Sequence, residues 1–220
     1  MPEILVQYQD EIWLTIGQTF IMVGASILAA VLIGLPLGTL IFLTRKEQLL
    51  ENRTIHIVLN LLVNIIRSFP FLLLVVFLIP FTRLILNTAI GTAAATIPLA
   101  IIAIAHYARL VEQSLLEVPK GIIEAALSMG ASVKNVIFKF LFVEARSGLV
   151  LGLTTSTISF ISYSTIMGVV GGGGIGDFAI RYGYQQFKTD LMMYMIIIMI
   201  ILVQCIQLFG TALAKKIDKR

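Results

Sequence analysis

Long apolar runs constrain the fold of this chain more than any other feature of its sequence. A helix that crosses a lipid bilayer needs about 20 mostly apolar residues, and five stretches of the chain meet or approach that length. None of them alternates with the period of a strand, and lipid accepts only helices or closed barrels. Only 13% of the residues are charged, about half the share of a soluble domain. The sequence therefore predicts an all-α integral membrane protein with five transmembrane helices, over Thr19–Leu43, Ile57–Ile79, Ile90–His106, Leu149–Val170 and Leu191–Leu213.

The distribution of basic residues predicts the side on which each end lies. Lys and Arg accumulate in the cytoplasmic segments of membrane proteins. Of the 16 basic residues, twelve fall in segments on the side of the C-terminus, three fall on the opposite side, and Arg67 lies within a predicted span. We therefore expect the N-terminus outside and the C-terminus in the cytoplasm. The net charge of +4 follows from this topology and does not indicate nucleic-acid binding. The first residues are acidic rather than basic, so we expect no cleaved signal peptide.

The longest predicted cytoplasmic segment, at about residues 107–148, contains two short helices. Pro119 suits the first turn of a helix, and Gly130 can end that helix with a positive φ. A second amphipathic piece follows over Ser132–Phe142. No linker or internal repeat divides the chain, so we expect one domain over residues 1–220. The apolar positions of the first short helix are predicted to share one face at spacings of three and four: Ile122, Ala125, Ala126 and Met129.

The run EAALSMG, Glu124–Gly130, resembles the coupling loop of permease subunits in bacterial ABC importers. The pattern of this EAA-loop permease family is Glu-Ala-Ala, three residues and Gly, then nine residues and Ile-x-Leu-Pro. The first part is present here, whereas Phe140, Phe142 and Val143 replace the Ile, Leu and Pro. Without the resemblance, the same residues also fit an interfacial helix pair at the cytoplasmic edge of the bundle. The resemblance implies contact with a cytoplasmic ATPase for Glu124, Ala125, Ala126, Ser128, Met129, Gly130, Ala131 and Ser132.

Three longer stretches resemble permeases of the MetI type, which serve bacterial methionine importers. They are Ile66–Ile85, Ala108–Ser132 and the glycine-rich Gly171–Tyr184. The resemblance implies the type I ABC importer permease fold and a multi-pass place in the bacterial cytoplasmic (inner) membrane. It implies that two copies of the chain associate with two cytoplasmic ATPases, which bind ATP and magnesium, and with an extracytoplasmic methionine-binding protein or lipoprotein. This chain would itself carry no catalytic residue, cofactor or metal, and would form the path for methionine.

Polar side chains within the predicted spans are candidates for that path, because they are costly in lipid. Asn60, Asn64 and Arg67 share one helix face by their spacing. They either line the path or pack against a neighbouring helix near the cytoplasmic side, and we favour packing. Pro70 is expected to bend this helix. The resemblance places the path along the span rich in Ser and Thr, so that the path candidates are Tyr163, Ser164, Ile166 and Met167, together with Asn64 and Arg67.

The last span carries a second polar face. Gln204, Gln207 and Thr211 share it, and we expect this face to pack against another helix. Cys205, the single cysteine, is expected to be a small packing residue, because a free Cys among apolar residues behaves as a small hydrophobe.

Two short motifs suggest chemistry that the rest of the sequence does not support. Gly171–Gly176 lacks the Lys and Ser or Thr of a phosphate-binding loop, so we expect a tight turn or an outer gate there. Gly174–Asp177 matches the GxGD pattern of intramembrane aspartyl proteases, which need a second Asp nearby, and no other Asp falls within a span.

An ATP-independent secondary transporter would need an ionisable coupling group near the midplane of the bilayer. The main alternative is therefore a permease of the same fold for another amino acid or small solute.

Overall fold

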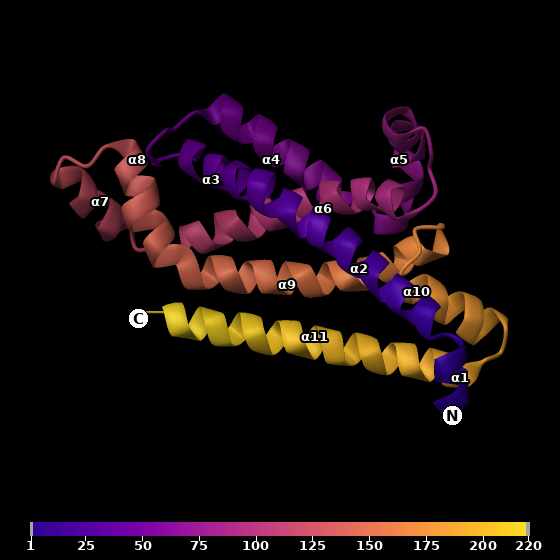
Figure 1. Cartoon of the computed structure of the whole chain (residues 1–220). Coiled ribbons are helices and arrows are strands. Elements are labelled where there is room, and N and C mark those ends of the chain that lie inside the picture. Colours follow the sequence, from indigo (N-terminus) through magenta and orange to yellow (C-terminus); the bar gives the residue numbers. More distant parts are fainter. Residues whose placement is uncertain (1, 219–220) are drawn as a thin grey trace.

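The computed structural model describes residues 2–218, and these residues form helices and turns without any strand. The long helices run side by side, and short helices lie at both ends of the bundle (Figure 1). The N-terminal helix and the C-terminal end of the last helix lie at opposite ends of it. The elements are α1 (Pro2–Gln7), α2 (Gln9–Ala29), η1 (Ala30–Gly34), α3 (Leu35–Thr44), α4 (Arg53–Ser68), α5 (Phe71–Leu86), α6 (Thr92–Leu116), α7 (Lys120–Ser128), α8 (Val133–Asn135), η2 (Val136–Leu141), α9 (Phe142–Val169), α10 (Ile175–Phe178), η3 (Ala179–Gln185) and α11 (Thr189–Ile217), where η marks a wider, π-helical turn.

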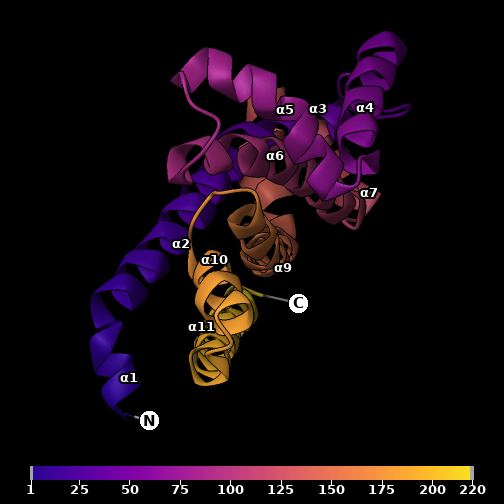
Figure 2. The same ribbon diagram turned by 90° about the vertical axis from the view of Figure 1, so that its right-hand side faces the viewer.

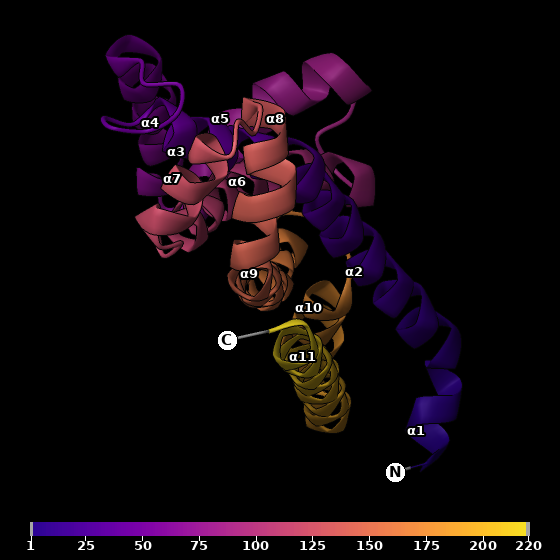
Figure 3. The ribbon, with the colours of Figure 1, turned by 90° about the vertical axis from the view of Figure 1, so that its left-hand side faces the viewer.

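Helix α6 is the centre of the bundle. It packs against α2, α3, α4, α5 and α9, and views from the two ends place it between α3 and α4 on one side and α9 on the other (Figures 2 and 3). Its buried side chains are mostly small or aliphatic, such as Ala103 and Ala108, so neighbouring backbones approach closely. The predicted end of this helix at His106 was wrong, since the helix continues to Leu116 and carries the charged pair Arg109 and Glu112 into the bundle.

The first long helix is continuous from Gln9 to Thr44 through α2, η1 and α3. Pro36 lies in the first turn of α3 and cannot donate a backbone hydrogen bond, which accounts for the wider π-helical turn just before it. Gly34 and Gly38 face α6. A Cβ at Gly34 would lie 2.8 Å from the Ile104 carbonyl oxygen, and one at Gly38 would lie 2.8 Å from the Val111 Cβ. These two glycines therefore allow the close contact of η1 and α3 with α6.

The predicted span Ile57–Ile79 falls on two separate helices, α4 and α5. Helices α4 and α5 together are apolar enough for a span, but they meet at an angle of 108°. Phe69 and Pro70 between them have extended backbones. Proline lacks the N–H that would continue the helix, and it pushes the preceding residue out of the helical region. The expected bend at Pro70 is therefore confirmed, as a complete break of the helix.

Three helical stretches of the described chain are long and apolar enough to cross a membrane, and the bent α4–α5 pair would make a fourth. Helix α9 is outside this set, although its 28 residues exceed the length needed. The three stretches are Gln9–Thr44, Thr92–Leu116 and Thr189–Ile217.

Helix α11 packs on α9 and, near its N-terminal end, on α10 and η3, whereas many of its outward side chains are exposed. Gly210 is buried there, with its backbone against the side chain of Thr154. Two expectations for this helix were wrong for the single chain. Cys205 is exposed rather than packed. Gln204 and Gln207 are also exposed, because the opposite side of the helix meets α9.

Candidate functional site

The EAA segment forms a short helix that ends in a tight, glycine-dependent cap. Helix α7 ends at Ser128, and Gly130 follows with φ 74°. The Gly130 N–H donates to the Leu127 carbonyl at 2.9 Å, and the Ala131 N–H donates to the Ala126 carbonyl at 3.1 Å. These two bonds make a Schellman motif, in which glycine is favoured at the left-handed position. The predicted helix end at Gly130 is confirmed.

The buried face of α7 differs from the predicted one. Ile123 and Ala126 are buried, and α7 packs on η2, where Val136 is fully buried. Ala125 and Met129, which the sequence spacing placed on one face with Ala126, are exposed. Of the eight predicted coupling residues, Ala126 is buried, Ala131 is half-buried, and the exposed ones are Glu124, Ala125, Ser128, Met129, Gly130 and Ser132.

The exposed edge of α7 is therefore a narrow surface of small side chains with one apolar tip. Met129 is 70% exposed, directly before the turn at Gly130. The Ser128 hydroxyl donates to the Glu124 carbonyl at 2.9 Å, so its proton is already used in a hydrogen bond within α7. Such a surface allows a partner's backbone to approach closely and offers a flexible thioether for a shallow apolar pocket.

A groove of about 400 Å3 runs beside α7, between this helix and the turn that joins α3 to α4. Glu124 and Leu127 line it from α7, and Leu49 lines it from the turn. Lys120 Nζ lies 3.4 Å from Glu47 Oε2 across the groove. Both side chains of this ion pair are largely exposed, so it contributes at most about 1 kcal/mol.

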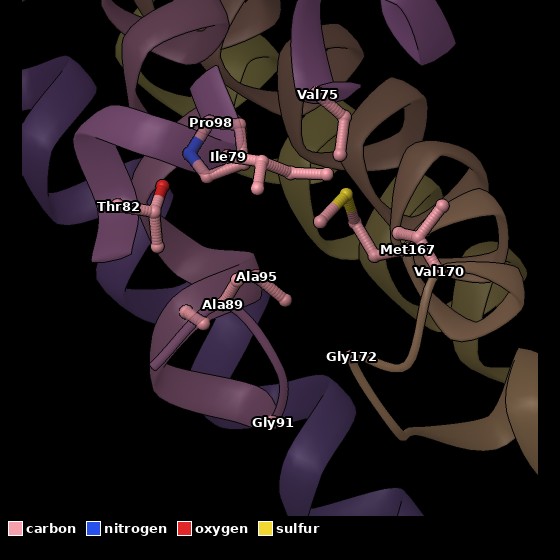
Figure 4. Close-up of a pocket in the computed structure, with 11 residues that line it drawn as sticks. Val75, Ile79, Thr82, Ala89, Gly91, Ala95, Pro98, Met167, Val170 and Gly172 are labelled. Atoms are coloured by element: carbon pink, nitrogen blue, oxygen red, sulfur yellow. The ribbon is translucent and has the colours of Figure 1, made fainter. Parts of the chain in front are cut away.

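Two of the predicted path residues, Tyr163 and Met167, face α5 from α9. The Tyr163 ring stacks on the Phe71 ring, with centroids 4.5 Å apart. The buried Ser164 hydroxyl donates to the Ile161 carbonyl at 2.7 Å, so its proton is used in a hydrogen bond within α9. Met167 is 2% exposed, and its side chain points toward Val75 across the cavity shown in Figure 4. Ile166 is half-buried.

The cavity at Met167 is small. It lies between α5, α6 and α9 and is lined by groups such as Ile79 and Pro98 (Figure 4). Its volume is about 30 Å3, enough for one or two water molecules. An amino acid does not fit in it, so the single chain encloses no solute path at this point.

Asn64 pairs with a residue that the sequence had not placed inside the bundle. Arg109 on α6 donates to the side-chain oxygens of Asn60 at 2.5 Å and Asn64 at 2.6 Å on α4. It also forms an ion pair with Glu112, whose side chain is only 5% exposed. Asn60 and Asn64 thus pack against a helix, the role favoured from the sequence, whereas Arg67 is exposed. The signal that could have revealed this network was the spacing of three between Arg109 and Glu112, which continues the helix of Ile90–His106.

The glycine-rich segment forms a tight turn in which side chains of α2 occupy two of the backbone donors. The Gly174 N–H donates to Gln18 Oε1 at 2.8 Å, and the Ile175 N–H donates to Thr19 Oγ1 at 2.9 Å. These amides are therefore not free to hold a phosphate. Asp177 forms an ion pair with Arg181 at 3.2 Å. Among the described residues, no group of three or more His, Cys, Asp or Glu side chains lies close enough to bind a metal ion.

Comparison with known proteins gives consistent matches over most of the chain. Residues 30–220 match the protein family described as "Binding-protein-dependent transport system inner membrane component". The chain is 46% identical to the probable D-methionine transport system permease protein MetI of Vibrio cholerae, over 92% of this chain and 90% of that protein. It is 41% identical to the methionine import system permease protein MetP of Bacillus subtilis, over 82% of each chain. Its structure is similar to a chain of the inward-facing MetNI methionine ABC transporter, with TM-score 0.94 and 37% identity, covering 97% of this chain and 99% of that one.

Proposed function

The chain belongs to the family of binding-protein-dependent transport system inner membrane components, and we infer that it is the permease subunit of an ATP-driven methionine importer. The observation that carries this inference is the close structural likeness to a methionine ABC transporter over nearly the whole chain. An exposed EAA helix that is braced against the bundle supports it. The substrate is methionine, in the L form or the D form, since relatives are named for both methionine and D-methionine transport.

In this proposal the chain is one permease domain over residues 1–220 that crosses the bacterial inner membrane five times. The spans are Gln9–Thr44, the bent α4–α5 pair, α6, α9 and α11. The N-terminus lies outside and the C-terminus lies in the cytoplasm, as the distribution of basic residues supports. The α7 helix then faces the cytoplasm, and the turn at Gly171–Gly174 faces outward.

Two copies of the chain form the path for the solute. A cavity of about 30 Å3 is too small for an amino acid, whereas an interface between two copies can enclose a larger one. Tyr163, Ser164, Ile166 and Met167 lie along this path, with Arg67 toward its cytoplasmic end. Asn64 holds α4 against α6 beside it through Arg109. An apolar thioether such as Met167 provides a lining that suits the methionine side chain.

Two copies of a separate ATPase bind ATP and magnesium and drive the transport cycle, so this chain hydrolyses nothing and carries no cofactor of its own. The ATPase holds the exposed edge of α7 from Glu124 to Ser132. Closure of the ATPase pair moves α7, and α7 moves α9 through its packing on η2. An extracytoplasmic methionine-binding protein delivers the substrate, and the two sides of the path open in turn.

Uptake of labelled methionine into liposomes tests this function. The vesicles contain this chain, its partner ATPase and the binding protein, and uptake of L-methionine and D-methionine is measured with and without ATP. We expect ATP-dependent uptake that Glu124→Arg combined with Gly130→Trp abolishes. The matched control is Glu117→Arg, which reverses an exposed charge just before α7 and should leave uptake intact.

Each part of the proposal has an outcome that contradicts it. Uptake that does not depend on ATP would exclude an ABC importer. ATP-dependent uptake of a different amino acid, with no uptake of methionine, would support an ABC importer and exclude methionine as its substrate. Equal loss of uptake in Glu117→Arg and in the double variant would show that the EAA surface has no specific role.

A further inference from the structure

A second groove lies between α2 and α11, two helices in stretches long and apolar enough to cross a membrane. The two helices diverge toward the C-terminal end of α11 (Figures 1 and 3). The gap holds an open groove of about 540 Å3 and an adjoining pocket of about 150 Å3 that reaches α9. Phe20, Leu202 and Ile206 line both, so the two spaces lie next to each other.

The lining of this groove is almost entirely apolar. On α11 it extends from Ile198 to Phe209, and on α2 it extends from Ile16 to Ile27. Phe209 is 73% exposed and Phe20 is 57% exposed. In a helix that spans a bilayer, such a groove is filled by lipid chains or by another helix, because it offers polar solutes nothing to bind.

A positive charge lies beyond the end of the groove, on the same face of α11. Lys216 lies 18 residues after Ile198, which is five full turns of an α-helix, so the two side chains point in the same direction. Lys216 is exposed. Its neighbour Lys215 is also exposed but points about 100° away from this face.

The dimensions match one leaflet of a bilayer. From Ile198 to Phe209 the helix rises about 17 Å, close to the ~15 Å thickness of one hydrocarbon leaflet. Lys216 lies seven residues beyond Phe209, about 10 Å further along the helix. Its side chain can reach back along the helix to the layer of phosphate groups.

We propose that this groove binds an anionic phospholipid, with an acyl chain between α2 and α11 and its phosphate on Lys216. The proposal requires only that the chain resides in a membrane, and it is independent of the transported solute. Basic pockets between transmembrane helices recognise anionic lipid headgroups in this manner. The apolar lining selects no particular headgroup, so the preference for an anionic lipid comes from Lys216.

The single cysteine provides a probe inside the groove. Cys205 lines it and is exposed, so a bimane fluorophore can be attached there without other substitutions. The labelled chain, in complex with its ATPase, is placed in phosphatidylcholine vesicles that contain equal small fractions of brominated phosphatidylglycerol or brominated phosphatidylcholine. Bromine quenches bimane on contact. We expect phosphatidylglycerol to be preferred about fivefold, the effect of the ~1 kcal/mol that one lysine contributes near an anionic surface.

Lys216→Gln should abolish this preference, and the matched variant Lys215→Gln should retain it. Native mass spectrometry of the unlabelled complex provides a second readout, in which Lys216→Gln should retain less phosphatidylglycerol than the unmodified chain. Equal loss in both lysine variants would reduce the effect to diffuse surface charge and overturn the proposal. Bimane that neither brominated lipid quenches, together with cross-linking of Cys205 to a second copy, would show that a helix of the partner fills the groove instead.

Discussion

Substitution of Glu112 by Gln tests whether the buried charge network holds α4 on α6. The Glu112 side chain is 5% exposed and pairs with Arg109, which is 16% exposed. Glutamine at this position keeps the shape of the side chain and removes its charge. Breaking a buried ion pair costs ~3–5 kcal/mol, because the remaining charge is left uncompensated. Arg109 keeps its two bonds to Asn60 and Asn64 and some solvent exposure, so we expect a smaller loss, of about 2–3 kcal/mol.

This loss should lower the midpoint of thermal unfolding by roughly 5–10 °C in a chain of this size. The measurement is the fraction of monodisperse protein that remains in detergent after heating, and the control is Lys120→Gln. That substitution breaks the exposed pair with Glu47 and should change stability by less than ~1 kcal/mol. The double substitution Arg109→Met with Glu112→Leu removes both charges and should recover most of the stability. If Glu112→Gln is no more destabilising than Lys120→Gln, the network does not stabilise the helix contact and the reasoning is refuted.

Three further predictions concern backbone conformation and close packing. Gly130→Ala should destabilise the α7 cap by ~1–2 kcal/mol, because the backbone φ at Gly130 is 74°. The control Gly121→Ala, at a site with open space, should be nearly neutral. Equal protease sensitivity of this loop in both variants would contradict the prediction. Gly38→Val should prevent folding, because the new side chain would clash with α6. The control Gly24→Val, at a site where nothing lies within 4 Å, should give a normal yield of folded protein. A folded Gly38→Val variant would show that α3 can move away from α6. Gln18→Ala removes the acceptor of a backbone N–H in the glycine-rich turn and should cost ~1–3 kcal/mol, and an unchanged unfolding midpoint would mean that water replaces the side chain.

The break between α4 and α5 shows how far local chemistry can be read from the sequence. Pro70 predicts an interruption, because its effects on the backbone act on adjacent residues. The angle of 108° is not a local property, since it depends on where α6 and α9 leave room for α5. For the same reason, the cap at Gly130 is predictable, whereas the direction in which α7 faces is not. Ala125 and Ala126 have identical side chains, and only packing on η2 buries the second and exposes the first.

The sequence by itself determined the class of protein, the candidate spans, the location of the EAA segment and its terminal glycine. These depend on the length of apolar runs, on charge distribution and on short motifs, all of which are encoded by neighbouring residues. Only the tertiary structure decided that Arg109 reaches Asn60 and Asn64, 49 and 45 residues away, and that Cys205 lies open in a groove. Such contacts depend on which helix faces meet, and the free energy of that choice is spread over the whole bundle rather than over any one segment.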